Sequence, residues 1–129
     1  MGEQVTRILV VDDEPSECEA LALGLASQKV AVDGAGDGHS GVRLGCTVDY
    51  AVLIVDLCLP DMDGMEVAQR IKHYQPDISI IVITAHSTRE KFHEATQLGV
   101  TAFLEKPFAL SAVRKAVAEA LAARARAQK

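Results

Sequence analysis

Short runs of consecutive apolar residues alternate along the chain with segments in which apolar residues recur every three or four positions. The runs are rich in valine and isoleucine and are bounded by turn-forming residues, which is typical of strands buried on both faces of a parallel sheet. Strands are predicted at residues 8–11, 30–35, 51–55, 78–84 and 101–105. The second of these mixes polar with apolar side chains, which indicates a strand at an edge of the sheet.

Helices are predicted between these strands and after the last one. Glu14-Pro15-Ser16 is typical of a helix start, because proline is favoured in the first turn. Two further helices are predicted over residues 40–44 and 65–74, and a fourth from a cap at Ser87 or Thr88 to Leu98-Gly99. The last helix is expected from Ala109 onward.

This alternation predicts an α/β fold: a five-stranded parallel sheet, doubly wound by right-handed crossovers, with five helices on its two faces. With the most polar strand at an edge, the expected strand order is 2-1-3-4-5, and ligands bind such sheets where the winding reverses. The 129 residues suit one domain, which we place at residues 1–122. Residues 123–129 are strong helix formers without an apolar stripe, so they are expected to be a helical tail or the start of a linker to a further domain.

Four of the predicted strands run directly into polar side chains. The first is followed by Asp12 and Asp13, the third by Asp56, the fourth ends at Thr84, and the fifth is followed by Lys106. Because parallel strands end at the same edge of a sheet, these side chains are expected to converge on one crevice.

Adjacent acids raise each other's pKa, so Asp12 and Asp13 need a cation nearby. Carboxylates, a backbone carbonyl and retained waters suit Mg²⁺, or Mn²⁺ in its place. Asp13 and Asp56 are the best candidates for direct metal ligands, with Asp12 acting through water and the backbone carbonyl of Cys58 as a third ligand.

Asp56 is the candidate nucleophile, since a carboxylate can attack phosphorus and form an aspartyl phosphate. Lys106 would serve as a point charge beside the phosphoryl group, and the hydroxyl of Thr84 would donate a hydrogen bond to it. The bond from Lys106 to Pro107 is a candidate for the cis form.

Composition narrows the class of protein. The 13 Lys and Arg against 18 Asp and Glu give a net charge of −5, which argues against direct nucleic-acid binding by this domain. No apolar stretch approaches the roughly 20 residues of a membrane span, so no membrane contact is expected. The cysteines, at positions 18, 46 and 58, are odd in number and lack CxxC spacing, which favours reduced thiols and a cytoplasmic location.

Four segments carry a resemblance to a known family. They are Val10-Val11-Asp12-Asp13-Glu14, Asp56-Leu57-Cys58-Leu59-Pro60-Asp61-Met62-Asp63-Gly64, Thr84-Ala85 and Phe103-Leu104-Glu105-Lys106-Pro107-Phe108. In order and spacing they closely resemble the receiver domains of two-component response regulators, over about residues 6–122. The resemblance implies a flavodoxin-like fold, and phosphorylation of Asp56 from a sensor histidine kinase, a phosphotransfer protein or a small phosphodonor, with Mg²⁺ required. It also implies that the domain takes part in its own phosphorylation and slow dephosphorylation without being a conventional enzyme.

The resemblance also implies roles for individual residues. Asp12 and Asp13 match the family's acidic pair, Thr84 its switch hydroxyl, Lys106 its phosphate-contacting lysine and Phe103 its rotating aromatic. Phosphorylation is expected to draw the Thr84 hydroxyl toward the phosphate, so that Phe103 swings into the vacated space. The face built from the fourth helix, fifth strand and fifth helix would then change.

The resemblance also implies partners that receive the signal from this domain. The segment from Phe103 to Phe108 resembles receivers coupled to transcription-activating ATPases. A C-terminal output domain or a downstream protein in transcription regulation is therefore expected, together with a phosphorylation-dependent homodimer.

Two positions are expected to set the lifetime of the phosphoryl group. Cys58 is small and cannot act as a strong base or hydrogen-bond donor for a hydrolytic water, whereas His86 can orient such a water or remain a plain exposed histidine.

Three other functional interpretations of the sequence compete with that of a receiver domain. Residues 36–41 match the dinucleotide fingerprint G-x-G-x-x-G, but they follow the more polar strand, and the acid expected some 20 residues on is Asp56, already part of the acidic cluster. A Mg²⁺-dependent phosphatase with an aspartyl nucleophile usually has a second acid two residues after the first, where this chain has Cys58. A non-phosphorylated protein-interaction module would not need the complete set of acids, threonine and lysine.

Overall fold

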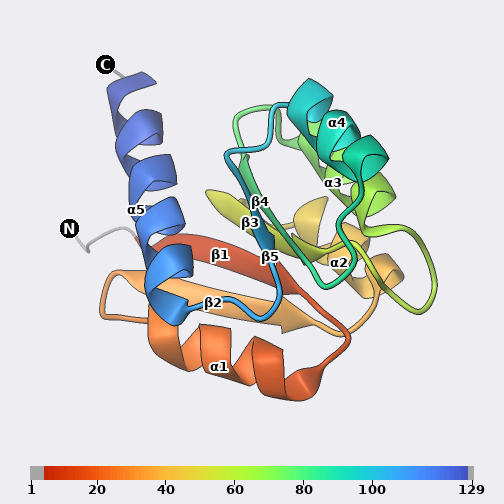
Figure 1. The fold of residues 1–129 in the computed structure, drawn as a ribbon. Coiled ribbons are helices and arrows are strands. Elements are labelled where there is room, and N and C mark those ends of the chain that lie inside the picture. The colour runs from red at the N-terminus through yellow and green to blue at the C-terminus, as the bar shows by residue number, and fades with distance from the viewer. Residues whose placement is uncertain (1–4, 128–129) are drawn as a thin grey trace.

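The five predicted strands form one parallel sheet, and the computed structural model describes residues 5–127 of the chain. The strands are β1 (Thr6–Val11), β2 (Val30–Ala35), β3 (Val52–Asp56), β4 (Ser79–Thr84) and β5 (Ala102–Glu105). Their order is β2-β1-β3-β4-β5, so the predicted order and the edge position of the second strand are both confirmed (Figure 1).

Five helices connect the strands and cover both faces of the sheet, as predicted. They are α1 (Pro15–Leu25), α2 (Gly38–Gly45), α3 (Gly64–Tyr74), α4 (Arg89–Leu98) and α5 (Leu110–Ala127). Helices α1 and α5 lie on one face, and α2, α3 and α4 lie on the other (Figure 1).

The two faces of the sheet build two separate hydrophobic cores because side chains alternate along each strand. In β3, Leu53 and Val55 pack with α3, whereas Val52 and Ile54 pack with α5 on the opposite face. All five residues of β3 are buried, which is why this strand has no polar position before Asp56.

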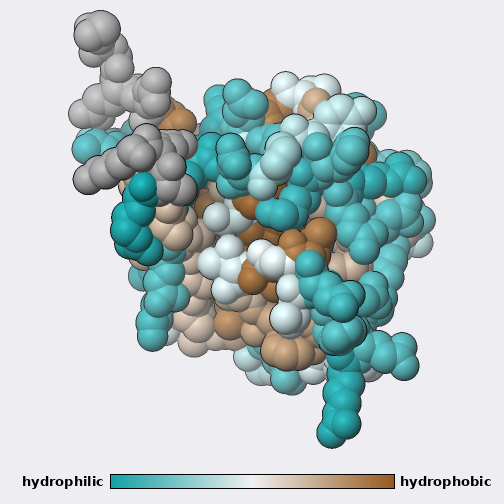
Figure 2. Space-filling model, turned by 90° about the horizontal axis from the view of Figure 1, so that it is seen from above, coloured by the Kyte–Doolittle hydropathy of each residue, from teal (hydrophilic) through white to brown (hydrophobic). Residues whose placement is uncertain are grey.

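Within residues 5–127, few large hydrophobic side chains remain exposed on the outer surface. Those more than half exposed are Leu23, Tyr74 and Phe92, and Val5 is 50% exposed. Seen from above, the surface is mostly hydrophilic around a central hydrophobic patch (Figure 2). None of the helices within residues 5–127 combines the length and apolar character needed to cross a membrane.

Side-chain caps explain where two helices begin. The hydroxyl of Thr88 accepts a hydrogen bond from the backbone N–H of Lys91, so Thr88 rather than Ser87 caps α4. Helix α2 begins at Gly38, two residues earlier than predicted. The side chain of Asp37 caps this helix, and the carboxylate of Asp61, from a distant loop, accepts hydrogen bonds from its first two N–H groups.

The C-terminal helix begins one residue later than predicted and continues through residue 127. The carbonyl of Ala109 accepts hydrogen bonds from the N–H groups of Ala112 and Val113, which starts the helical ladder. The predicted tail over residues 123–129 is therefore helical as far as residue 127, and residues 128–129 lie outside the described part of the chain.

The strand register brings the polar strand ends to one level. Val11 pairs with Val55, so Asp12 lies beside the end of β3 where Asp56 stands. Thr84 pairs with Glu105, which places Lys106 one residue beyond the end of β4.

The return of the chain after β3 depends on Gly64. A Cβ atom at this position would lie 2.1 Å from the backbone oxygen of Asp56, closer than any real contact allows. We therefore expect Gly64→Ala to lower the free energy of unfolding by about 2–3 kcal/mol in urea titrations. Gly36→Ala is the matched control because its Cβ would meet nothing within 4 Å. Equal losses of stability in the two variants would contradict this interpretation.

Candidate functional site

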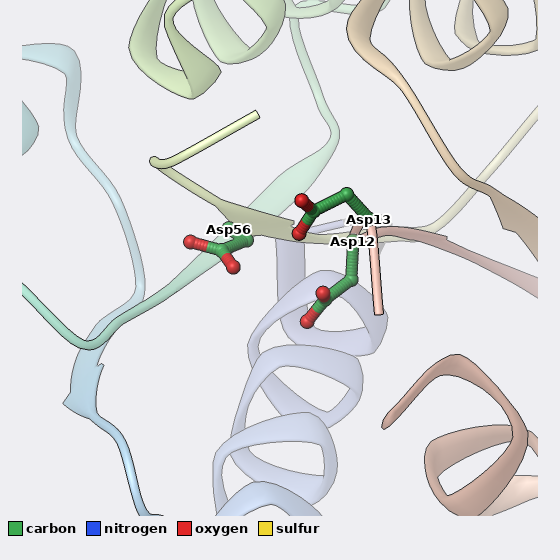
Figure 3. A group of neighbouring side chains, drawn as sticks. All are labelled: Asp12, Asp13 and Asp56. Carbon is green, nitrogen blue, oxygen red and sulfur yellow. The ribbon is translucent and has the colours of Figure 1, made fainter. Parts of the chain in front are cut away.

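Three aspartates gather at the carboxyl edge of the sheet. Asp12 follows β1, Asp13 is its neighbour, and Asp56 is the last residue of β3 (Figure 3). Each offers a carboxylate oxygen that lies within 4.8 Å of those of the other two. Asp12 is completely buried and Asp56 is 4% exposed, whereas Asp13 faces solvent.

Backbone N–H groups fix the orientation of the two buried carboxylates. Asp12 Oδ1 accepts a hydrogen bond from the N–H of Glu14, and Asp56 Oδ1 accepts one from the N–H of Cys58, each at 2.9 Å. In both cases the donor lies two residues after the aspartate, where the chain turns away from the strand. One oxygen of each carboxylate is thereby held, and the other is left for a cation.

Lys106 supplies that cation from the loop after β5. Its ammonium donates hydrogen bonds to Asp56 Oδ2 at 2.7 Å and to Asp12 Oδ2 at 3.2 Å. It also lies 2.5 Å from Glu17 Oε2 and 3.6 Å from Glu14 Oε1. The lysine side chain is only 9% exposed, so these contacts are poorly screened by water.

Burial and charge act in opposite directions on these groups. Burial raises the pKa of Asp12, and the neighbouring carboxylate of Glu17 raises it further, against the opposing effects of the Glu14 N–H and Lys106. Burial alone would lower the pKa of Lys106, but its contacts with Asp56, Glu17 and Asp12 hold that pKa above its usual range. The site therefore carries more negative charge than its one ammonium can neutralise.

The predicted hydroxyl stands at the same edge of the sheet. Thr84 is completely buried, and its Oγ1 accepts a hydrogen bond from the N–H of His86 at 3.2 Å. The backbone N–H of Lys106 donates to the carbonyl of Thr84 at 2.8 Å, which ties the loops after β4 and β5 together. The peptide bond between Lys106 and Pro107 is cis, as its sequence allowed.

The predicted aromatic switch residue lies next to α4. Phe103 is half-buried in β5, and its ring meets that of Phe92 edge to face, with the ring centroids 5.4 Å apart. It is thus positioned between the core and the surface of α4, and its expected inward swing stays a prediction.

The two residues expected to control phosphoryl lifetime lie at the mouth of the site. Cys58 and His86 are both exposed, and each is joined through its backbone N–H to a site residue, Asp56 and Thr84 respectively. Their effects on a phosphoryl group stay predictions.

Sequence reasoning missed Glu14 and Glu17 as neighbours of Lys106. Both follow the acidic pair at the start of α1, and they are three residues apart, which places them on the same side of a helix. That spacing was the available signal, but charged residues in a first helical turn are ordinarily solvated.

The dinucleotide fingerprint has no room for a phosphate. The N–H groups of Gly38 and His39, which would bind it, donate instead to the carboxylate of Asp61. The side chain of Met62 lies against Gly38, where a Cβ would meet its Cγ at 2.2 Å.

Comparisons with known proteins give the family of the chain. The family model of the response regulator receiver domain matches residues 8–118. The transcriptional regulatory protein GlrR of Escherichia coli K12 is 35% identical over 121 residues, which are 94% of this chain and 27% of GlrR. The chain spans about a quarter to a half of the length of the curated relatives that it matches.

Two solved structures show how closely the fold is shared. The CheY-like receiver domain protein from Methanospirillum hungatei JF-1 superposes with a TM-score of 0.91 at 22% identity, covering 95% of this chain and 98% of that one. A response regulator from Burkholderia pseudomallei, solved with a phosphorylated aspartic acid, a calcium ion and citrate, has a TM-score of 0.81 at 25% identity, covering 94% of this chain and 72% of that one. With its family match, its strand order and its transcription-regulating relatives, this chain belongs to the response regulator receiver domain family of two-component systems.

Proposed function

We propose that this chain is a phosphorylation-controlled signalling switch that accepts a phosphoryl group on Asp56. The donor would be a sensor histidine kinase, a phosphotransfer protein or a small phosphodonor. The observation that carries the proposal is the meeting of three aspartates and Lys106 at the ends of three strands. Family membership supports it, since receiver domains are the signal-accepting parts of response regulators.

The proposed chemistry is a direct displacement at phosphorus. A carboxylate oxygen of Asp56 forms the new bond to phosphorus, and the bond to the leaving group breaks as that group keeps the electron pair. Because the transition state is loose, the domain mainly positions groups and neutralises charge. Lys106 lies 2.7 Å from Asp56, so its ammonium is beside the place where the phosphoryl group would be attached.

The donor set of the site fits Mg²⁺, or Mn²⁺ in its place. Oxygen ligands and surplus negative charge suit a hard divalent cation. Asp13 and Asp56 would bind it directly with the carbonyl of Cys58, while Asp12 would act through water. When bound, the metal would neutralise charge on the incoming phosphoryl group.

The conformational change would begin at Thr84 and would then move Phe103. A phosphate beside Lys106 would draw the Thr84 hydroxyl away from its present partner, the N–H of His86. Phe103 would then move inward from its contact with Phe92 on α4, changing the face formed by α4, β5 and α5. A shift from 1:99 to 99:1 requires about 5.5 kcal/mol, which a few charge-assisted hydrogen bonds at roughly 1.5–3 kcal/mol each can supply.

The expected partners follow from the relatives. GlrR and CusR of Escherichia coli K12 are transcriptional regulatory proteins much longer than this chain. We therefore propose a receiver domain over residues 1–122, followed by a helical tail or a linker to an output domain of transcription regulation. A cytoplasmic location and a phosphorylation-dependent homodimer belong to the same proposal.

The direct test is chemical phosphorylation followed by intact mass. Incubation with acetyl phosphate or phosphoramidate and Mg²⁺ should add one phosphoryl group to the wild-type protein and none to Asp56→Asn, which lacks the nucleophile. Asp49→Asn is the matched control because its exposed carboxylate lies just before the opposite end of β3. Modification of Asp56→Asn, or rapid multiple turnover of a phosphomonoester by the wild type, would contradict the proposal.

The lifetime of the phosphoryl group should depend on the mouth of the site. We expect Cys58→Asn and His86→Ala to change the dephosphorylation rate of the phosphorylated domain, because each alters the approach of water to Asp56. The rate is measured by intact mass after removal of the phosphodonor. Unchanged rates in both variants would rule out this role.

The surplus negative charge should make stability depend on pH. The pKa of Asp12 is higher in the folded domain than in the unfolded chain. The wild-type domain therefore has its full stability below the unfolded pKa and loses stability as the pH rises through the folded pKa. Asp12→Asn escapes that loss, so without Mg²⁺ it should be the more stable protein at neutral pH, with the advantage shrinking in acid.

Urea titrations at several pH values measure this effect. Asp49→Asn, with an exposed carboxylate, should show no such trend. A destabilised Asp12→Asn at neutral pH would be the contrary result.

A further inference from the structure

The shortest contact of the Lys106 ammonium is with a residue that the proposed chemistry does not use. Nζ lies 2.5 Å from Glu17 Oε2, compared with 2.7 Å from Asp56 and 3.2 Å from Asp12. Glu17 is the third residue of α1, so this contact joins the first helix to the loop after the last strand.

The Glu17 oxygen has no other polar partner among the described residues. Oε2 is buried, and its approach to Lys106 is an ion pair that lacks hydrogen-bond alignment. If the lysine turned away, this oxygen would lose the one cation beside it. That loss would be unfavourable, because it would leave a buried carboxylate unpaired.

A phosphoryl group that approaches Lys106 meets carboxylates that already contact its ammonium. An ammonium has three N–H donors. Two donate to Asp12 and Asp56, and the remaining side of the ammonium faces Glu17. A phosphoryl oxygen that binds Lys106 must therefore compete with these carboxylates for the ammonium, whereas Glu14 is farther away at 3.6 Å.

Glu17 is the carboxylate that can leave. The side chains of Asp12 and Asp56 are 0% and 5% exposed, and a backbone N–H holds one oxygen of each. The side chain of Glu17 is 26% exposed and is longer, so it can rotate from the helix into solvent.

We propose that Glu17 is a positioning residue that restrains Lys106 in the resting domain and so slows phosphorylation of Asp56. This inference rests on the proposed function. The incoming phosphoryl group and Glu17 compete for one ammonium, and the phosphoryl group can win only when Glu17 turns outward. The chain thereby sets a barrier to phosphorylation by small donors that is separate from the metal and from Asp56 itself.

The test is the initial rate of phosphorylation by acetyl phosphate at saturating Mg²⁺, followed by intact mass. Glu17→Gln keeps the length of the side chain and removes its charge, and we expect it to react about three- to tenfold faster than the wild type. Glu19→Gln is the matched control, because it makes the same change on an exposed residue of the same helix. Glu17→Ala should show the same acceleration as Glu17→Gln, and circular dichroism checks that each variant is folded.

A double-mutant cycle separates action through Lys106 from a general change of charge. In a Lys106→Ala background, Glu17→Gln should no longer accelerate the reaction, since there is no ammonium left to release. An equal acceleration with and without Lys106 would overturn the proposal, as would a Glu17→Gln rate equal to that of Glu19→Gln. If the wild type gains no phosphoryl group at all, the proposed function fails. If the wild type is phosphorylated and Glu17→Gln matches it, only the role of Glu17 fails.

Discussion

The arrangement of the site depends on one buried ion-pair network, in which the ammonium of Lys106 lies between the carboxylates of Asp12 and Asp56. Two buried carboxylates at neighbouring strand ends would destabilise the domain without a cation beside them. Lys106 is 94 residues from Asp12 along the chain, and the contact therefore forms only when β1, β3 and β5 are in their final register. The same interaction that completes the sheet thus assembles the site.

The network is also unbalanced, and this imbalance gives the site its chemistry. Asp13, Glu14 and Glu17 add negative charge around a single ammonium. In the proposed function, a divalent cation would bind the surplus carboxylates and a phosphoryl group would bind the lysine. The resting domain is in this sense preorganised for a ligand and held back by Glu17.

The fold and the outline of the site could be predicted because they depend on local patterns. Apolar runs ending at Asp12, Asp56 and Thr84 define parallel strands, and the parallel arrangement alone brings their ends together. Helix α2 starts two residues earlier than predicted, directly after its local cap Asp37. The second carboxylate at this helix start, that of Asp61, comes from a distant loop and could not be predicted. The contact between Glu17 and Lys106 is of the same kind, because sequence alone does not distinguish a solvated helical glutamate from a buried partner.

We expect Lys106 to bind the phosphoryl group and the aspartates to bind the metal. A crystal structure of the domain with Mg²⁺ and beryllofluoride, a mimic of the phosphoryl group, tests it most directly. We expect beryllofluoride on Asp56, Mg²⁺ bound by Asp13 and Asp56, and the Lys106 ammonium on a fluoride with Glu17 turned to solvent. A metal bound away from these aspartates, or a Lys106 that stays between Asp12 and Glu17 without touching fluoride, would contradict it.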